Sequence, residues 1–252
     1  MDALLLHGLG GGPADMDALA EGLSAQGWRC HAPCLPGHGA DWEDLVRSHW
    51  RQWSEAAHAA YAALAVQGAE PPLIAGYSLG GLLALDTLAW AESRGLPAPR
   101  CLLVFAAPLS WASRPGRLGE RAVRWRLAWK AWRQPVEICS PRSEAARTTA
   151  PWQGHERILC WRHLTEIARE QPRLRAILPR CAVPLCYAQL WHDSSCPRRN
   201  AVEWICTASR MAETHVLRTA SRHGGHLPLA HRESRDEVVR IACAFVRKVL
   251  DA

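Results

Sequence analysis

The segment Gly-Tyr-Ser-Leu-Gly-Gly at residues 76–81 constrains the fold more than any other part of the chain. An apolar run at 72–76 leads into it and a helical pattern over 79–92 follows, which predicts a sharp turn from a strand into a helix. Such a turn leaves little room beside its central residue, so glycines at 76 and 80 are expected. The turn would raise the Ser78 hydroxyl above a sheet, at the amino end of a helix.

Short apolar runs alternate with helical patterns along the chain, and this alternation predicts an α/β fold with a mainly parallel sheet. A length of 252 residues suits one such core. We expect six strands, at 3–7, 29–34, 72–76, 101–106, 184–190 and 214–217. Helices are expected at 15–25, 50–66, 79–92, 199–210 and 234–250.

The segment 111–182 breaks the alternation, because it contains no strand-like run and prolines divide it into several helical stretches. We therefore expect a core of residues 1–110 and 183–252, with residues 111–182 inserted as a helical lid. This lid holds 14 Arg and Lys130 against 6 Glu, a net charge of +9, while the rest of the chain has a net charge of −3. The whole basic excess of the protein thus lies in the lid.

Tryptophan is also concentrated in the lid, and several apolar residues there recur at helical spacing. They are Leu118, Ala122, Trp125, Trp129 and Trp132. One interpretation is that this stripe packs the lid onto the sheet while arginines cover the exposed face. The other is that Trp125 and Trp129 line an acyl pocket and that some arginines contact an anionic substrate group or a lipid surface.

A serine hydroxyl becomes a good nucleophile only when an imidazole accepts its proton and a carboxylate orients that imidazole. Asp193 follows the apolar run 185–192, and His226 lies between the last expected strand and the last expected helix. Their order after Ser78 suits partners placed at the carboxyl ends of successive strands. Asp193 could instead cap a helix, and His226 could be a solvated loop residue.

Backbone N–H groups that stabilise a developing oxyanion are expected near the same serine. Leu79 directly follows Ser78, and Leu9 lies in the glycine-rich loop after the first strand, so these two amides are our candidates. A nucleotide-binding loop is the competing interpretation of residues 7–12. Pro13 breaks the required glycine spacing, and no lysine follows to complete a phosphate-binding loop.

The remaining composition excludes several other classes of protein. Cys30, His31 and Cys34 do not share one face of an extended strand, so we expect no metal site there and no cofactor elsewhere. The arginines form no recognisable nucleic-acid motif, and no apolar run reaches the length of a membrane span. The cysteines show no metal or disulfide spacing, and we expect a cytoplasmic protein with reduced thiols.

Five motifs in this order resemble the α/β-hydrolase superfamily, and most closely the small bacterial carboxylesterases and monoacylglycerol lipases. They are Leu-Leu-Leu-His-Gly-Leu at 4–9, Pro-Gly-His-Gly at 36–39, Gly-Tyr-Ser-Leu-Gly-Gly at 76–81, His-Asp at 192–193 and Gly-His at 225–226. The resemblance implies Ser78 as nucleophile, His226 as base and Asp193 as its partner. It also implies that the amides of Leu9 and Leu79 form the oxyanion hole.

We therefore expect a serine hydrolase that cleaves carboxylic esters, with short- to medium-chain acyl esters or monoacylglycerol-like molecules as substrates. A thioesterase acting on acyl-coenzyme A or acyl-carrier substrates would use the same residues and stays open as an alternative. A hydrolase fold without activity, binding a ligand or partner through its basic lid, is the second alternative.

Overall fold

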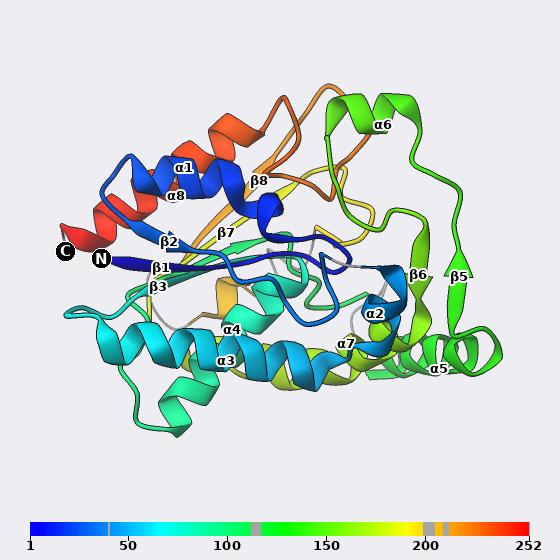
Figure 1. Cartoon of the computed structure of the whole chain (residues 1–252), viewed down its shortest axis with the longest axis horizontal. Helices are drawn as coiled ribbons and strands as arrows, with labels where there is room; N and C mark the ends of the chain where they lie inside the picture. Colours follow the sequence, from blue (N-terminus) through cyan, green and yellow to red (C-terminus); the bar gives the residue numbers. More distant parts are fainter. Residues whose placement is uncertain (40, 112–116, 199–204, 209–211, 252) are drawn as a thin grey trace.

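The centre of the molecule is a six-stranded sheet in the order β2-β1-β3-β4-β7-β8, in which every neighbouring pair is parallel (Figure 1). The computed structural model describes residues 1–39, 41–111, 117–198, 205–208 and 212–251. The expected α/β-hydrolase architecture is confirmed. The strands are β1 (Asp2–Leu6), β2 (Arg29–His31), β3 (Leu73–Tyr77), β4 (Leu102–Phe105), β7 (Leu185–Leu190) and β8 (Ala212–Leu217).

Helices cover both faces of this sheet, because its strands carry apolar side chains on both sides (Figure 1). Leu4 and Leu6 pack into the core on one face, with helices α3 and α4, while Ala3 and Leu5 pack on the other, with α1 and α8. Within the described ranges, no helix is both long and apolar enough to cross a bilayer. The helices of the core are α1 (Asp17–Ser24), α2 (Trp42–Arg47), α3 (Trp50–Gln67), α4 (Leu79–Ser93) and α8 (Arg235–Leu250), with a short 3₁₀ turn at Pro13–Met16 (η1); a second, Leu178–Arg180 (η2), lies at the end of the segment between β4 and β7.

Between β4 and β7 the chain forms the inserted segment, and here the sequence-based expectation of helices alone was wrong. It contains α5 (Arg117–Arg133), α6 (Glu144–Thr149) and α7 (Trp161–Arg175), but also an antiparallel pair, β5 (Val136–Ile138) and β6 (Ile158–Cys160). Each of these strands has only three residues, too few to show alternation, and the two pair across some twenty intervening residues. Below, "lid" denotes the described residues of 111–182.

Two other expectations differ from the structure at the level of elements. Helix α2 was not anticipated, because six residues are too short for a helical stripe to stand out. The helix expected over 199–210 lies mostly outside the described residues. Its described part contains a single 3₁₀ turn, η4 (Ile205–Thr207).

The turn between β3 and α4 has the geometry that its glycines predicted. Ser78 takes a left-handed backbone conformation with φ of 53°, which is unfavourable for a residue with a side chain. A Cβ atom on Gly76 would collide with the backbone of Gly80, and one on Gly80 would collide with the carbonyl of Leu6. The turn therefore lies directly against β1, and its backbone approach excludes any side chain at these positions.

We expect Gly80→Ala to destabilise the protein strongly, because the Leu6 carbonyl belongs to a central strand and cannot move aside. Forced overpacking typically lowers the free energy of unfolding by about 1–3 kcal/mol. A clash with backbone should lower it by an amount at the upper end of this range or above. Thermal unfolding should show a melting temperature lowered by at least several degrees. Gly12→Ala is the matched control, because a Cβ atom there has no neighbour within 4 Å. Equal melting temperatures for the two variants would contradict this packing.

Candidate active site

Ser78, His226 and Asp193 lie in contact, although they come from three distant parts of the chain. Ser78 follows β3, Asp193 follows β7, and His226 lies in the loop between β8 and α8. The Ser78 Oγ atom is 2.9 Å from Nε2 of His226, and Nδ1 of His226 is 2.9 Å from Oδ2 of Asp193. The three side chains thus form a continuous hydrogen-bonded chain at the carboxyl edge of the sheet.

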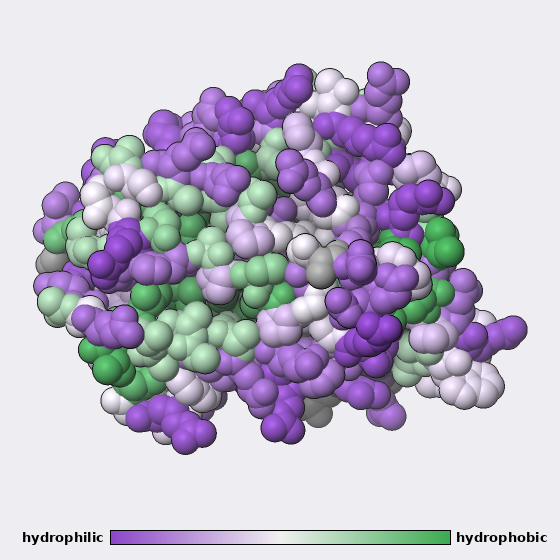
Figure 2. Space-filling view, in the orientation of Figure 1, coloured by the Kyte–Doolittle hydropathy of each residue, from purple (hydrophilic) through white to green (hydrophobic). Residues whose placement is uncertain are grey.

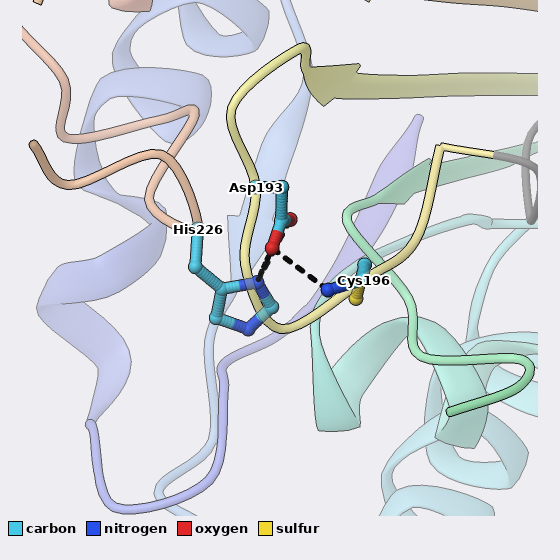
Figure 3. Close-up of side chains that lie close together, drawn as sticks. All are labelled: Asp193, Cys196 and His226. Atoms are coloured by element: carbon cyan, nitrogen blue, oxygen red, sulfur yellow. Dashed lines mark hydrogen bonds and ion pairs between the residues drawn. The ribbon is translucent and has the colours of Figure 1, made fainter. Parts of the chain in front are cut away.

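Asp193 is held in place beside the imidazole (Figure 3). Its side chain has no exposed surface, and its Oδ1 accepts backbone hydrogen bonds from Ser195 and Cys196, both at 2.8 Å. These bonds are of the type that a helix-capping aspartate makes, so Asp193 combines a local turn contact with its contact to His226. Buried, amide-bonded carboxylates of this kind fix the orientation and tautomer of a histidine.

Asp193, Cys196 and His226 also bring their potential metal-ligating atoms within 4.8 Å of one another (Figure 3). The Cys196 thiol donates a hydrogen bond to the carbonyl of Ala106 at 2.8 Å. Burial, followed by the nearby Asp193 carboxylate, raises the pKa of this thiol well above its usual value. Since metals bind the thiolate, a protonated thiol committed to a carbonyl fits a packing role better than a ligand role.

The glycine-rich loop after β1 reaches the same place. Leu9 and Leu79, the two candidate oxyanion-hole residues, both line the cavity beside Ser78. His7 supports this loop from below, because its Nε2 accepts a bond from the Leu35 amide and its Nδ1 therefore donates to the Gly8 carbonyl. The loop conformation that would aim the Leu9 amide is thus tied to the buried core.

A large cavity of about 530 Å³ extends from Ser78 beneath the lid. Leu9, Leu79 and Pro108 form its floor, whereas α5, β6 and α7 supply most of its apolar walls. A cavity of this size and character suits a hydrocarbon chain. Its apolar lid residues are Trp111, Val123, Leu127, Leu159, Trp161, Leu164 and Ile167.

Trp125 and Trp129, which one of the two interpretations placed along an acyl pocket, do not line this cavity, and their exposure also differs from that of a stripe packed onto the sheet. They are 71% and 41% exposed, and Trp132 on the same face is 81% exposed. The side of α5 that faces the cavity carries Val123 and Leu127, one helical turn apart. Periodicity identified an apolar stripe on α5 but assigned the inner side to the larger tryptophans, whereas two smaller aliphatic residues occupy it.

A second cavity of about 300 Å³ opens on the other side of the serine. It shares Leu9, Ser78, Ser194 and His226 with the large cavity. The rest of its lining includes polar and cationic groups, which sequence reasoning did not single out because they are far apart in the chain. They are Arg142, His192 and Arg222, beside Tyr77, Trp152, Gly224, Gly225 and Leu227.

Three buried histidines connect the glycine-rich loop to the lid. His7 contacts His38 edge-on, with ring centroids 4.9 Å apart, and His38 and His163 both contact the ring of Trp53. Burial lowers the pKa of all three, to about 3 for His38 and to about 4 for His163. These imidazoles are therefore neutral around pH 7, consistent with the acceptor role of His7.

We expect this cluster to make the protein sensitive to acid. Because the folded pKa values lie below the ordinary 6.5, the unfolded chain binds more protons at mildly acidic pH. The stabilising contribution is therefore complete above about pH 6.5 and decreases as the pH falls toward 4, by up to about 1.4 kcal/mol per pH unit for each histidine. Urea unfolding of wild type and His38→Gln between pH 7 and 4.5 measures this. A smaller decrease for His38→Gln is expected, and parallel curves would contradict the prediction.

Comparison with known sequences agrees with the geometry of the site. The model of the alpha/beta hydrolase family matches residues 3–241. A carboxylesterase of Bacillus subtilis (strain 168) is 39% identical over 98 residues, which is 39% of each chain. A thermostable monoacylglycerol lipase of Bacillus sp. (strain H-257) is 35% identical over 82 residues, 32% of each chain. The matched region thus spans less than half of these curated relatives.

Solved structures share the fold over nearly the whole chain. A structure described under LipS and LipT, two metagenome-derived lipolytic enzymes, aligns with a TM-score of 0.76 at 19% identity, covering 98% of this chain and 93% of the other. A soluble variant of monoglyceride lipase from Saccharomyces cerevisiae aligns with a TM-score of 0.75 at 13% identity, covering 98% and 86%. At such identities the likeness concerns the fold. The resemblance drawn from the sequence motifs is confirmed.

Proposed function

We propose that this chain, which belongs to the alpha/beta hydrolase family, is a serine hydrolase that cleaves carboxylic esters through an acyl-enzyme. The observation that supports this most directly is the hydrogen-bonded chain from Ser78 through His226 to Asp193. These are the elements of nucleophilic acyl transfer: a hydroxyl, a base within reach of its proton, and a buried carboxylate that orients the base. The named carboxylesterase and monoacylglycerol lipase relatives support the same reaction class.

In this mechanism Ser78 Oγ attacks the ester carbonyl while His226 Nε2 takes its proton. The negative charge that develops on the carbonyl oxygen would be stabilised by the amides of Leu9 and Leu79. His226 then donates the proton to the leaving alcohol, and Asp193 stabilises the imidazolium in between. Water, activated by the same imidazole, attacks the acyl-enzyme and releases the carboxylic acid.

The large cavity indicates which esters fit. Its apolar walls come mainly from α5, β6 and α7, so we propose residues 111–182 as a lid that selects the acyl part, on a core of residues 1–110 and 183–252. A volume of about 530 Å³ accommodates a short- to medium-length acyl chain. We accordingly propose acyl esters of this length, including monoacylglycerol-like molecules, as substrates.

Ser78→Ala should lower kcat for hydrolysis of a medium-chain ester by on the order of 10⁴-fold or more, because it removes the nucleophile. The same variant should lose labelling by a fluorophosphonate probe. Ser93→Ala is the matched control, because Ser93 is the last residue of α4, the helix that Ser78 precedes, and among the described residues its hydroxyl bonds only the Trp90 carbonyl. Full hydrolysis by folded Ser78→Ala would refute the assignment. A parallel set of thioesters of equal acyl length separates esterase from thioesterase activity.

We also propose that the outer face of α5 contacts lipid surfaces from which the substrate is drawn. Trp125, Trp129 and Trp132 are exposed along this face, between basic residues such as Arg121 and Arg133. Figure 2 shows hydrophilic side chains around several apolar areas, one of them at the right-hand edge where β5 and β6 lie. Ile138 on β5 is itself 71% exposed. Exposed indole rings among cations suit an interface of anionic lipid and water.

Replacing Trp125, Trp129 and Trp132 together by Gln should weaken binding to vesicles containing phosphatidylglycerol by about tenfold or more, since each buried aromatic contributes apolar area. Sedimentation of protein with vesicles measures the effect. Val66→Gln removes an exposed apolar side chain on α3 and should leave binding unchanged. Equal vesicle binding of the triple variant and wild type would refute the contact.

A further inference from the structure

We propose that the preferred substrate carries an anionic oxygen group, phosphate or carboxylate, on the alcohol part of the ester, and that Arg142 binds this group in the second cavity. The inference rests on the proposed ester hydrolysis and names the substrate class for that site. It follows from how the two cavities divide the space around Ser78, and from the unmatched charge of Arg142.

The two cavities meet at the reacting atoms but differ in the side chains that line them. Ser78 and His226 line both, so one substrate bound at Ser78 extends into each. The large cavity is walled mainly by apolar lid residues, with Arg126 also in its lining, whereas Arg142, His192 and Arg222 line the second. A hydrocarbon chain belongs in the first, because burying it there removes apolar surface from water. The alcohol part is left for the second, where it meets two guanidinium groups.

Arg142 has an incomplete set of partners. Its Nη2 donates to the carbonyls of Ala146 and Ala150, both at 2.8 Å, while its Nη1 is buried and has no hydrogen-bond partner. Among the described residues, no carboxylate forms an ion pair with it. A partly buried cation with an idle donor is costly, and an anionic oxygen of a phosphate or carboxylate would accept a charge-assisted hydrogen bond from Nη1.

The fold places this guanidinium next to the catalytic loop. Gly224, two residues before His226, has φ of +69°, and a Cβ atom there would lie 2.5 Å from Cβ of Ala150 and 3.6 Å from Nη2 of Arg142. The loop that carries Gly224 therefore packs directly against Ala150, at the carboxyl end of α6, and against Arg142, which precedes this helix. Arg222, on the same loop, is exposed and adds a second positive charge to the cavity lining.

Arg142 also has a structural role, because it satisfies two carbonyls at the end of α6. A purely structural role would change melting temperature and the hydrolysis of every ester alike. Recognition of an anion would instead change the ratio of kcat/KM between an anionic ester and its neutral counterpart. This ratio is the quantity to measure.

Two matched pairs of octanoyl esters provide this ratio of kcat/KM. The first pair is 1-octanoylglycerol 3-phosphate and 1-octanoylglycerol, and the second is the octanoyl ester of glycolate and that of ethylene glycol. In wild type, kcat/KM should be about tenfold or more higher for the anionic member of at least one pair. The pair with the larger ratio distinguishes phosphate from carboxylate. Arg142→Gln should bring that ratio close to one, and Arg142→Lys should retain part of it. Arg147→Gln, on the neighbouring α6 but paired with Glu156 at the surface, should leave the ratio unchanged.

If Arg142→Gln does not fold, inhibition of the wild-type enzyme still tests whether the second cavity binds an anion. Glycerol 3-phosphate should then inhibit hydrolysis of 1-octanoylglycerol competitively, and far more strongly than glycerol. Neutral esters cleaved as well as anionic ones in both pairs, or a ratio unchanged in folded Arg142→Gln, would overturn anion recognition and leave ester hydrolysis standing. Absence of hydrolysis for all four esters, together with no fluorophosphonate labelling of Ser78, would instead overturn the proposed function and this inference with it.

Discussion

The close approach of the β3–α4 turn to β1 is the constraint on which the rest of the site depends. Gly80 lies against the Leu6 carbonyl and Gly76 against Gly80, so no side chain separates the turn from the sheet. This approach holds Ser78 in a left-handed conformation that it would not otherwise favour. The strain is offset by the buried strands and helices on both faces, and it puts the hydroxyl where the loops after β1, β7 and β8 converge.

From that point outward, each group is held by a neighbour that is itself buried. His226 is oriented by Asp193, which accepts two backbone amides, and the Gly8 carbonyl is held by His7. Preorganisation of this kind matters because a catalytic group that must first be ordered loses part of its effect. The glycine-rich loop and the imidazole are thus tied to the core, while the exposed tryptophans of α5 are free to contact surroundings.

The lid and the β8–α8 loop divide the space above Ser78 into two unlike compartments. Val123 and Leu127 on α5 line the large cavity, whereas Arg142, between β5 and α6, lines the second. The arginines that give residues 111–182 their net charge of +9 therefore lie in different surroundings. Arg126 and Arg142 line the two cavities at the proposed catalytic residues, while others, such as Arg121 and Arg133, lie along the exposed aromatic face.

The sequence by itself determined the sheet, the sharp turn and the candidates Ser78, Asp193 and His226, because each depends on local chemistry: apolar runs, obligatory glycines and residue types in chain order. The inner face of α5, the short pair β5–β6 and the position of Arg142 were decided only by the tertiary structure. Which side of an amphipathic helix faces inward depends on the shape of its neighbours, and Arg142 meets the His226 loop across more than eighty residues. Local periodicity carries no information on such contacts, whereas packing of the lid against the loops after β1, β7 and β8 fixes them.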